Sequence, residues 1–86
     1  DETKGMLFVF PESRRRKFWM KDTLIPLDIL FISEDFIIIH IVEAEPCTKD
    51  PCLLYDSQGL AQYVLELNKG FSKQHRIEIG DTISLP

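Results

Sequence analysis

One stretch of the chain, residues 36–42, constrains the fold more than any other. It reads Phe-Ile-Ile-Ile-His-Ile-Val, so that His40 is its only polar residue. β-branched and aromatic side chains pack well on a pleated surface, and this run therefore predicts a strand. A second apolar run, residues 27–32, precedes it, and the turn-forming sequence Ser-Glu-Asp at 33–35 separates the two. The pair predicts an antiparallel β-hairpin.

The N-terminal region predicts one further strand and a loop. Residues 6–10 are apolar throughout, and Pro11 follows them. An apolar run of this length that ends at a proline is typical of a buried strand. Residues 12–17 are polar and contain four consecutive basic side chains, Arg14 to Lys17. Such a composition is typical of a solvated loop.

The C-terminal region predicts a helix and a closing hairpin. Leu60, Val64 and Leu67 recur at three- and four-residue spacing, which favours a helix over about residues 60–68, with Gly70 as its left-handed stop. The dipeptide Gly80-Asp81 lies between two alternating segments and predicts a two-residue hairpin turn.

This order of elements predicts a mainly β (β-rich α+β) fold. We expect a small antiparallel β barrel or sandwich with one α-helix over an open end. The 86 residues suffice for one hydrophobic core and not for two, which predicts a single domain over residues 1–86. The hydrophobic fraction of 44% is ordinary for a globular chain.

Charge and hydropathy limit the classes of partner. The net charge of −4 argues against nucleic acid as a partner, because nucleic-acid-binding proteins usually carry a basic excess. No apolar stretch approaches the roughly 20 residues that cross a bilayer, so no transmembrane segment is predicted. The basic run Arg14 to Lys17 is a local exception that could meet an acidic partner or an anionic surface.

Cys47 and Cys52 lie in a C-x4-C arrangement within a proline-containing loop. We expect a structural disulfide that stiffens this loop, which implies an oxidising compartment or the cytoplasm of a thermophile. Free buried thiols are an alternative. A zinc site completed by His40 and His75 is another, although the two histidines do not form a local pair and no metal site is predicted.

Polar side chains inside apolar runs mark the candidate binding site. In an extended segment, Trp19 and Lys21 point to the same side, next to Asp22. Asp28 interrupts an apolar run, and a buried carboxylate needs a partner. Glu66, between two leucines, is a second such carboxylate. These five residues form the predicted ligand-binding set.

The sequence contains no recognisable catalytic or cofactor motif. There is no G-x-S-x-G elbow, H-E-x-x-H pair or glycine-rich phosphate loop, so no catalytic residue and no cofactor is predicted. Asp28 and Glu66 are the two carboxylates that could do acid-base work if they faced each other across a cleft.

The order of several motifs resembles the uncharacterised prokaryotic domain of unknown function 192 family. The resemblance covers almost the whole chain and runs through the following segments: 5–11 (Gly-Met-Leu-Phe-Val-Phe-Pro), 18–28, Pro46-Cys47, Cys52, 63–68 and Gly80-Asp81. It implies a compact β-rich fold with one helix, often exported, and no established activity. The usual Trp-Met-Lys-Asn-Thr signature has Asp22 in place of Asn, which exchanges an amide donor for a possible charge.

Members of that family usually carry a further N-terminal strand region before the motif that begins at Gly5. We expect this chain to lack that region and therefore to expose a sheet edge. An exposed edge predicts a homodimer or another intermolecular sheet contact.

These observations lead to three functional hypotheses. The first is a small extracytoplasmic ligand-binding or accessory module, periplasmic or secreted, for an unknown small molecule or protein. The second is a small hydrolase or carbohydrate-active enzyme that uses Asp28 and Glu66, which requires the two carboxyl groups to lie within about 10 Å. The third is an interaction module that acts through the basic segment 14–17.

Overall fold

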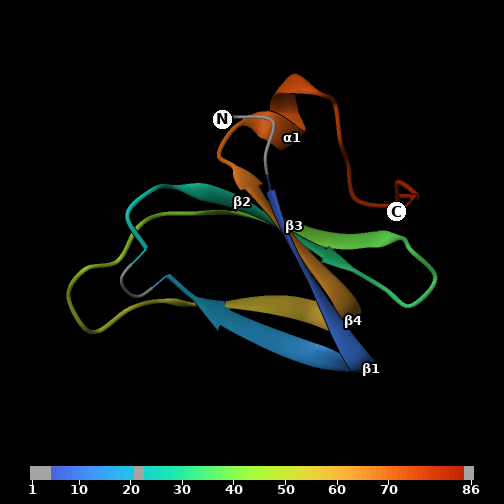
Figure 1. Cartoon of the computed structure of the whole chain (residues 1–86), viewed down its shortest axis with the longest axis horizontal. Coiled ribbons are helices and arrows are strands. Elements are labelled where there is room, and N and C mark those ends of the chain that lie inside the picture. Colours follow the sequence, from blue (N-terminus) through green and yellow to red (C-terminus); the bar gives the residue numbers. More distant parts are fainter. Residues whose placement is uncertain (1–4, 21–22, 85–86) are drawn as a thin grey trace.

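An antiparallel sheet forms the framework of the molecule (Figure 1). The computed structural model describes residues 5–20 and 23–84. Within these residues the strands are β1 (Gly5–Trp19), β2 (Leu27–Ile32), β3 (Ile38–Ala44) and β4 (Leu54–Asn68), and the helix is α1 (Phe71–Gln74). The strands lie in the order β1-β4-β2-β3, and every neighbouring pair is antiparallel. The predicted mainly β class and the hairpin of β2 and β3 are therefore confirmed.

The sheet buries apolar side chains on both of its faces, because successive residues of a strand point to opposite sides. We call the face that carries Ile29 and Phe31 the inner face; both side chains are fully buried there. The opposite face carries Leu30 and Ile32, which are equally buried, and we call it the helix face. Two apolar clusters on one thin sheet therefore form the core.

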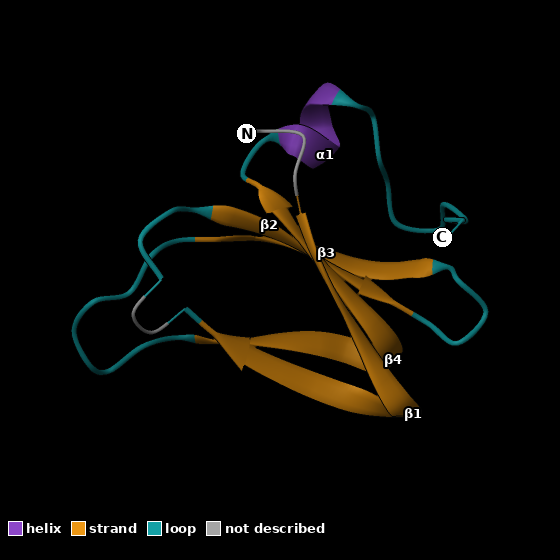
Figure 2. Ribbon diagram, in the orientation of Figure 1, coloured by secondary structure: helices purple, strands orange, loops and turns teal. Residues whose placement is uncertain are grey.

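The second half of β1, residues 10–19, and the part of β4 paired with it cover the inner face. We call this second half of β1 its distal half. Both strands are long, and beyond the crossing with β2 and β3 they turn beneath these shorter strands (Figure 2). Phe18 from the distal half of β1 packs edge-on against Phe31, with ring centroids 6.0 Å apart. The result is sandwich-like, and the sheet stays open rather than closing into a barrel, since β1 and β3 do not pair.

The helix face is covered by α1 and the segment that follows it. Phe71, Ile77 and Ile83 pack against the apolar cluster of this face. The Ile83 N–H donates to the Phe36 carbonyl at 2.8 Å, which fastens the segment to the start of β3. The predicted closing hairpin is wrong: Gly80 adopts a left-handed turn, with φ of 98°, but the flanking residues pair with the β3 side instead of forming two strands.

The predicted helix over residues 60–68 is also wrong, because these residues form the second half of β4. β4 contributes Val64 to the cluster on the inner face and Leu65 and Leu67 to the cluster on the helix face, so apolar side chains are needed on both of its faces. A strand that is buried on both sides loses the two-residue alternation and mimics helical spacing. Gly70 does adopt the expected left-handed conformation, with φ of 93°, but it precedes α1 instead of ending a helix.

The predicted loop at residues 12–17 is wrong as well. β1 continues through Pro11 and the basic run, with irregular pairing between Val9 and Arg14 and again between Arg15 and Lys17. Among the described strands β1 is an edge strand, where proline and basic side chains are tolerated because no described strand lies on one side of its backbone.

The proline-containing loop between β3 and β4 is as expected and carries the predicted disulfide. Cys47 and Cys52 are bridged, with their Cα atoms 5.8 Å apart. Elsewhere, the part of the chain that the structure describes contains no helix long and apolar enough to cross a membrane. The predicted homodimer through a sheet edge stays a prediction.

Candidate functional site

Asp28 anchors α1 to the sheet. It lies on the helix face at the start of β2 and is 2% exposed. One carboxylate oxygen accepts a hydrogen bond from the Ser72 N–H at 2.9 Å, and the other accepts one from the Gly70 N–H at 3.3 Å. The buried carboxylate therefore has the partners that its position requires, and they are backbone amides.

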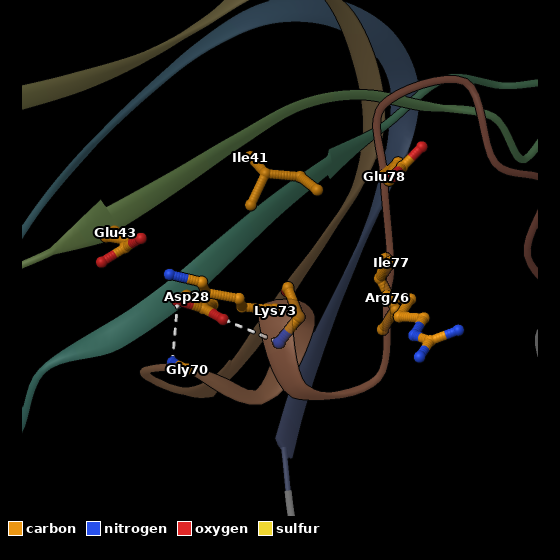
Figure 3. Close-up of a pocket in the computed structure, with 9 residues that line it drawn as sticks. Asp28, Ile41, Glu43, Gly70, Lys73, Arg76, Ile77 and Glu78 are labelled. Carbon is orange, nitrogen blue, oxygen red and sulfur yellow. Dashed lines mark hydrogen bonds between the residues drawn. The ribbon is translucent and has the colours of Figure 1, made fainter.

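A pocket lies directly above this anchor, between β2, β3 and the chain from α1 onward (Figure 3). Its volume is about 530 Å³. We call it the Asp28 pocket; its lining residues are Asp28, Ile41, Glu43, Gly70, Ser72, Lys73, Arg76, Ile77 and Glu78. It combines charged side chains of both signs with two isoleucines, so that it can contact both polar and apolar parts of a ligand.

The charges of the Asp28 pocket are only partly compensated within the chain. Glu43 lies 3.7 Å from the ammonium group of Lys69. Lys73 and Arg76 form no ion pair with any residue that the structure describes. In Figure 3, Lys73 lies beside Asp28, whereas Arg76 projects from the opposite wall. The pocket therefore offers two cations whose hydrogen-bonding capacity is unused.

Ser72 adds a buried hydroxyl group. The residue is 5% exposed, and its Oγ has no hydrogen-bond partner among the described residues. A buried hydroxyl without a partner is unusual, since burial removes its hydrogen bonds to water. Its position in the lining of the Asp28 pocket makes it a candidate contact for a polar ligand.

The structure does not bring together the three predicted ligand-binding residues that it describes. Lys21 and Asp22 lie outside the described residues. Trp19, 55% exposed, lies at the end of β1 and lines a depression with the basic run. Glu66 lines a third hollow, at the other end of β1. Trp19, Asp28 and Glu66 therefore belong to three different surface regions.

Glu66 and Asp28 lie on opposite faces of the sheet. Asp28 is opposite Leu67 in the pairing of β2 and β4, and Ile29 is opposite Glu66. Directly paired residues share a face and successive residues alternate, so Glu66 lies on the inner face with Ile29. Burial raises the pKa of Glu66. The two carboxylates share no cleft, and this arrangement does not provide the acid-base pair that the enzyme hypothesis requires.

Sequence reasoning did not select the other lining residues of the Asp28 pocket as site residues. Ser72 and Lys73 follow directly after Gly70, where a helix was expected to end. Arg76 opens the segment that was expected to form a hairpin. A basic side chain in a polar segment is ordinary, and only the packing of α1 over Asp28 places these residues at one site.

The residues considered for zinc have other contacts. Both cysteines are in the disulfide. His40 stacks on Phe31 at 6.2 Å and His75 stacks on Phe71 at 4.1 Å. Among residues 5–20 and 23–84, no three His, Cys, Asp or Glu side chains gather in a way that could hold a metal ion.

The structure is an open antiparallel sheet whose helix face carries a polar pocket above a buried aspartate. The chain belongs to the DUF192 family (Uncharacterized ACR), which matches residues 1–85. The predicted resemblance is therefore confirmed.

Two solved structures share this fold. A crystal structure from Sinorhizobium meliloti 1021, described as a "putative transcription regulator", is 41% identical, covers 95% of this chain and has a TM-score of 0.87. A protein of unknown function from Novosphingobium aromaticivorans is 30% identical, covers 99% of this chain and has a TM-score of 0.89. The chain spans 62% and 59% of the lengths of those two chains. No functionally curated protein is similar to it.

Proposed function

We propose that this domain is a non-enzymatic binding module and that the Asp28 pocket holds a small polar ligand. The observation that carries the proposal is a pair of cations that form no ion pair with any described residue: Lys73 beside the buried carboxylate of Asp28, and Arg76 on the opposite wall of the pocket. The volume of about 530 Å³ lies within the range of small-molecule sites.

The lining residues indicate the chemistry of the ligand. Lys73 and Arg76 donate hydrogen bonds only, and they favour a carboxylate or phosphate group. Glu43 and Glu78 accept hydrogen bonds and favour ligand hydroxyl or ammonium groups. The Ser72 hydroxyl is able to do both. A compact ligand with one anionic group and several hydroxyl or amino groups would satisfy all of them.

The compartment is part of the proposal. A disulfide persists where the environment is oxidising, and the bridge between Cys47 and Cys52 therefore supports a periplasmic or secreted location. The cytoplasm of a thermophile is the alternative, because intracellular proteins of such organisms also contain disulfides.

Among the residues selected from the sequence that the structure describes, namely Trp19, Asp28 and Glu66, only Asp28 lines this pocket. Because Asp28 also holds two backbone amides, its replacement would alter folding and binding together. Ligand contacts by Trp19, Lys21, Asp22 and Glu66 stay predictions. Trp19 and Glu66 line hollows other than the Asp28 pocket.

A thermal-shift screen tests the proposed function. The panel contains amino acids, hydroxy acids, monosaccharides and sugar phosphates at millimolar concentration. We expect at least one class to raise Tm by several degrees, because a ligand that binds only the folded chain stabilises it by mass action. Lys73→Gln and Arg76→Gln should each reduce the shift, whereas Lys49→Gln, in the exposed disulfide loop, should not. An identical response in all three variants would refute the proposed pocket.

A further inference from the structure

β1 is an open edge of the described sheet. β4 lies on one side of it, and none of the described strands lies on the other. The opposite edge, β3, is partly covered, since the Ile38 N–H donates to the Asp81 carbonyl at 2.9 Å. No comparable backbone hydrogen bond reaches β1 from the C-terminal segment within the described residues. On the side away from β4, β1 faces no described strand, so this edge offers a position for an additional strand.

The distal half of this open edge carries a basic and aromatic surface. A depression of about 400 Å³ lies there, and we call its lining the basic surface: Phe10, Arg14, Arg15, Arg16, Lys17, Phe18 and Trp19. The guanidinium carbon of Arg16 lies 3.8 Å from the centre of the Phe10 ring. Stacking of this kind fixes the direction of the charge.

The basic surface keeps an excess of positive charge. Arg14 pairs with Glu12 at 2.7 Å, and Arg15 pairs with Asp56 at 2.8 Å. Arg16 donates to the carbonyls of Ala61 and Glu12, and neither it nor Lys17 forms an ion pair with a described carboxylate. This local excess contrasts with the net charge of −4 of the whole chain.

We propose that the distal half of β1 binds an extended acidic segment of another protein as an additional strand. The open backbone of β1 supplies main-chain hydrogen bonds, and the basic surface selects carboxylate side chains. The exposed indole of Trp19 supplies an apolar contact at the end of the strand. This inference is independent of the Asp28 pocket, which lies on the helix face.

A second copy of the chain fits this segment less well. Antiparallel pairing of two copies about Arg15 would place Arg14 of one opposite Arg16 of the other. Like charges directly opposite each other destabilise a strand pair. Self-pairing in this register is therefore disfavoured, whereas an acidic segment brings opposite charges to the basic surface.

Titration with defined peptides tests this inference, because Trp19 is the only tryptophan of the chain and reports binding by its fluorescence. The probe is a capped peptide of about eight residues, somewhat longer than a typical strand, in which glutamate alternates with threonine. Matched peptides carry glutamine or lysine in place of glutamate. We expect the acidic peptide to bind about tenfold more tightly than the glutamine peptide and the lysine peptide not to bind.

Two controls separate strand addition from simple charge attraction. A version of the acidic peptide with N-methyl groups on alternate residues lacks half of its backbone donors and should lose binding. Lys17→Glu should weaken binding of the acidic peptide about fivefold or more, whereas Lys49→Glu makes the same change of charge in the disulfide loop and should leave it within about twofold.

Several results would overturn the inference. Equal affinity for the glutamate and glutamine peptides, or unchanged affinity after N-methylation, would exclude the proposed recognition. So would tighter binding to phosphatidylserine vesicles than to the acidic peptide. Light scattering measures whether the chain forms a dimer. A dimer that becomes more stable in the Lys17→Glu variant would show that a second copy of the chain, and not an acidic partner, binds this edge.

Discussion

Asp28 on β2 and Ser72 in α1 are 44 residues apart in sequence and are joined by a hydrogen bond of 2.9 Å. Together with the bond from Gly70, this contact fixes the only described helix above the sheet and forms the floor of the Asp28 pocket. One buried carboxylate therefore determines both the position of α1 and the shape of the proposed site.

Replacement of Asp28 should consequently destabilise the chain. We expect Asp28→Ala to reduce the free energy of unfolding by roughly 2 to 4 kcal/mol, because two backbone amides lose a charged acceptor. Asp28→Asn keeps one carbonyl oxygen and should lose less. Urea denaturation measures both changes. Asp35→Ala, at an exposed turn, is the control, and equal losses for Asp28→Ala and Asp35→Ala would contradict the anchoring role.

The disulfide should stabilise the loop between β3 and β4. Cys47 and Cys52 are five residues apart, and on the loop-entropy model so short a ring contributes about 2 kcal/mol. The double variant Cys47→Ser/Cys52→Ser should show this loss in denaturant titration. Addition of a reductant should destabilise the natural chain by a similar amount and leave the variant unaffected. A natural chain that is insensitive to the reductant would show that the bridge contributes nothing.

Glu66 should make stability depend on pH. Burial raises the pKa of Glu66 in the folded chain, so folding favours its protonated form. The contribution of Glu66 to the free energy of unfolding is fully present below the ordinary Glu pKa of about 4.3. This contribution is lost as the pH rises through the raised pKa of the folded chain. Glu66→Gln should therefore raise Tm at pH 7 by a small amount, equivalent to less than about 1 kcal/mol, and should have no such effect near pH 3. Glu34→Gln, in an exposed turn, should show no comparable trend.

The folding of β1 over the inner face can be tested through Phe18 and Phe31. Their edge-on contact predicts a coupling energy of about 0.5 to 1.5 kcal/mol in a double-mutant cycle with Phe18→Leu and Phe31→Leu. Phe71 packs on the helix face, so Phe71→Leu should be additive with Phe31→Leu. Additivity of the Phe18 and Phe31 variants would mean that the distal half of β1 does not pack there.

Part of the fold was predictable because it depends on local physics. The apolar runs of β2 and β3, the second of them rich in β-branched residues, have a polar turn between them and favour a hairpin in almost any surroundings. The two cysteines are close enough in sequence to pair without long-range folding. The need of Asp28 for a partner also followed from the sequence, because a carboxylate inside an apolar run cannot stay alone.

The tertiary structure alone decided the other elements. The residues at 60–68 have a spacing that suits a helix or a strand buried on both sides, and only their position between β1 and β2 selects the strand. The basic run at 14–17 is extended because it lies at a sheet edge, which its composition does not reveal. The Asp28 pocket likewise depends on where α1 packs. The spacing of apolar residues indicates which side chains will be buried. Which strands or helices cover those side chains depends on contacts between distant parts of the chain, and the spacing does not show these contacts.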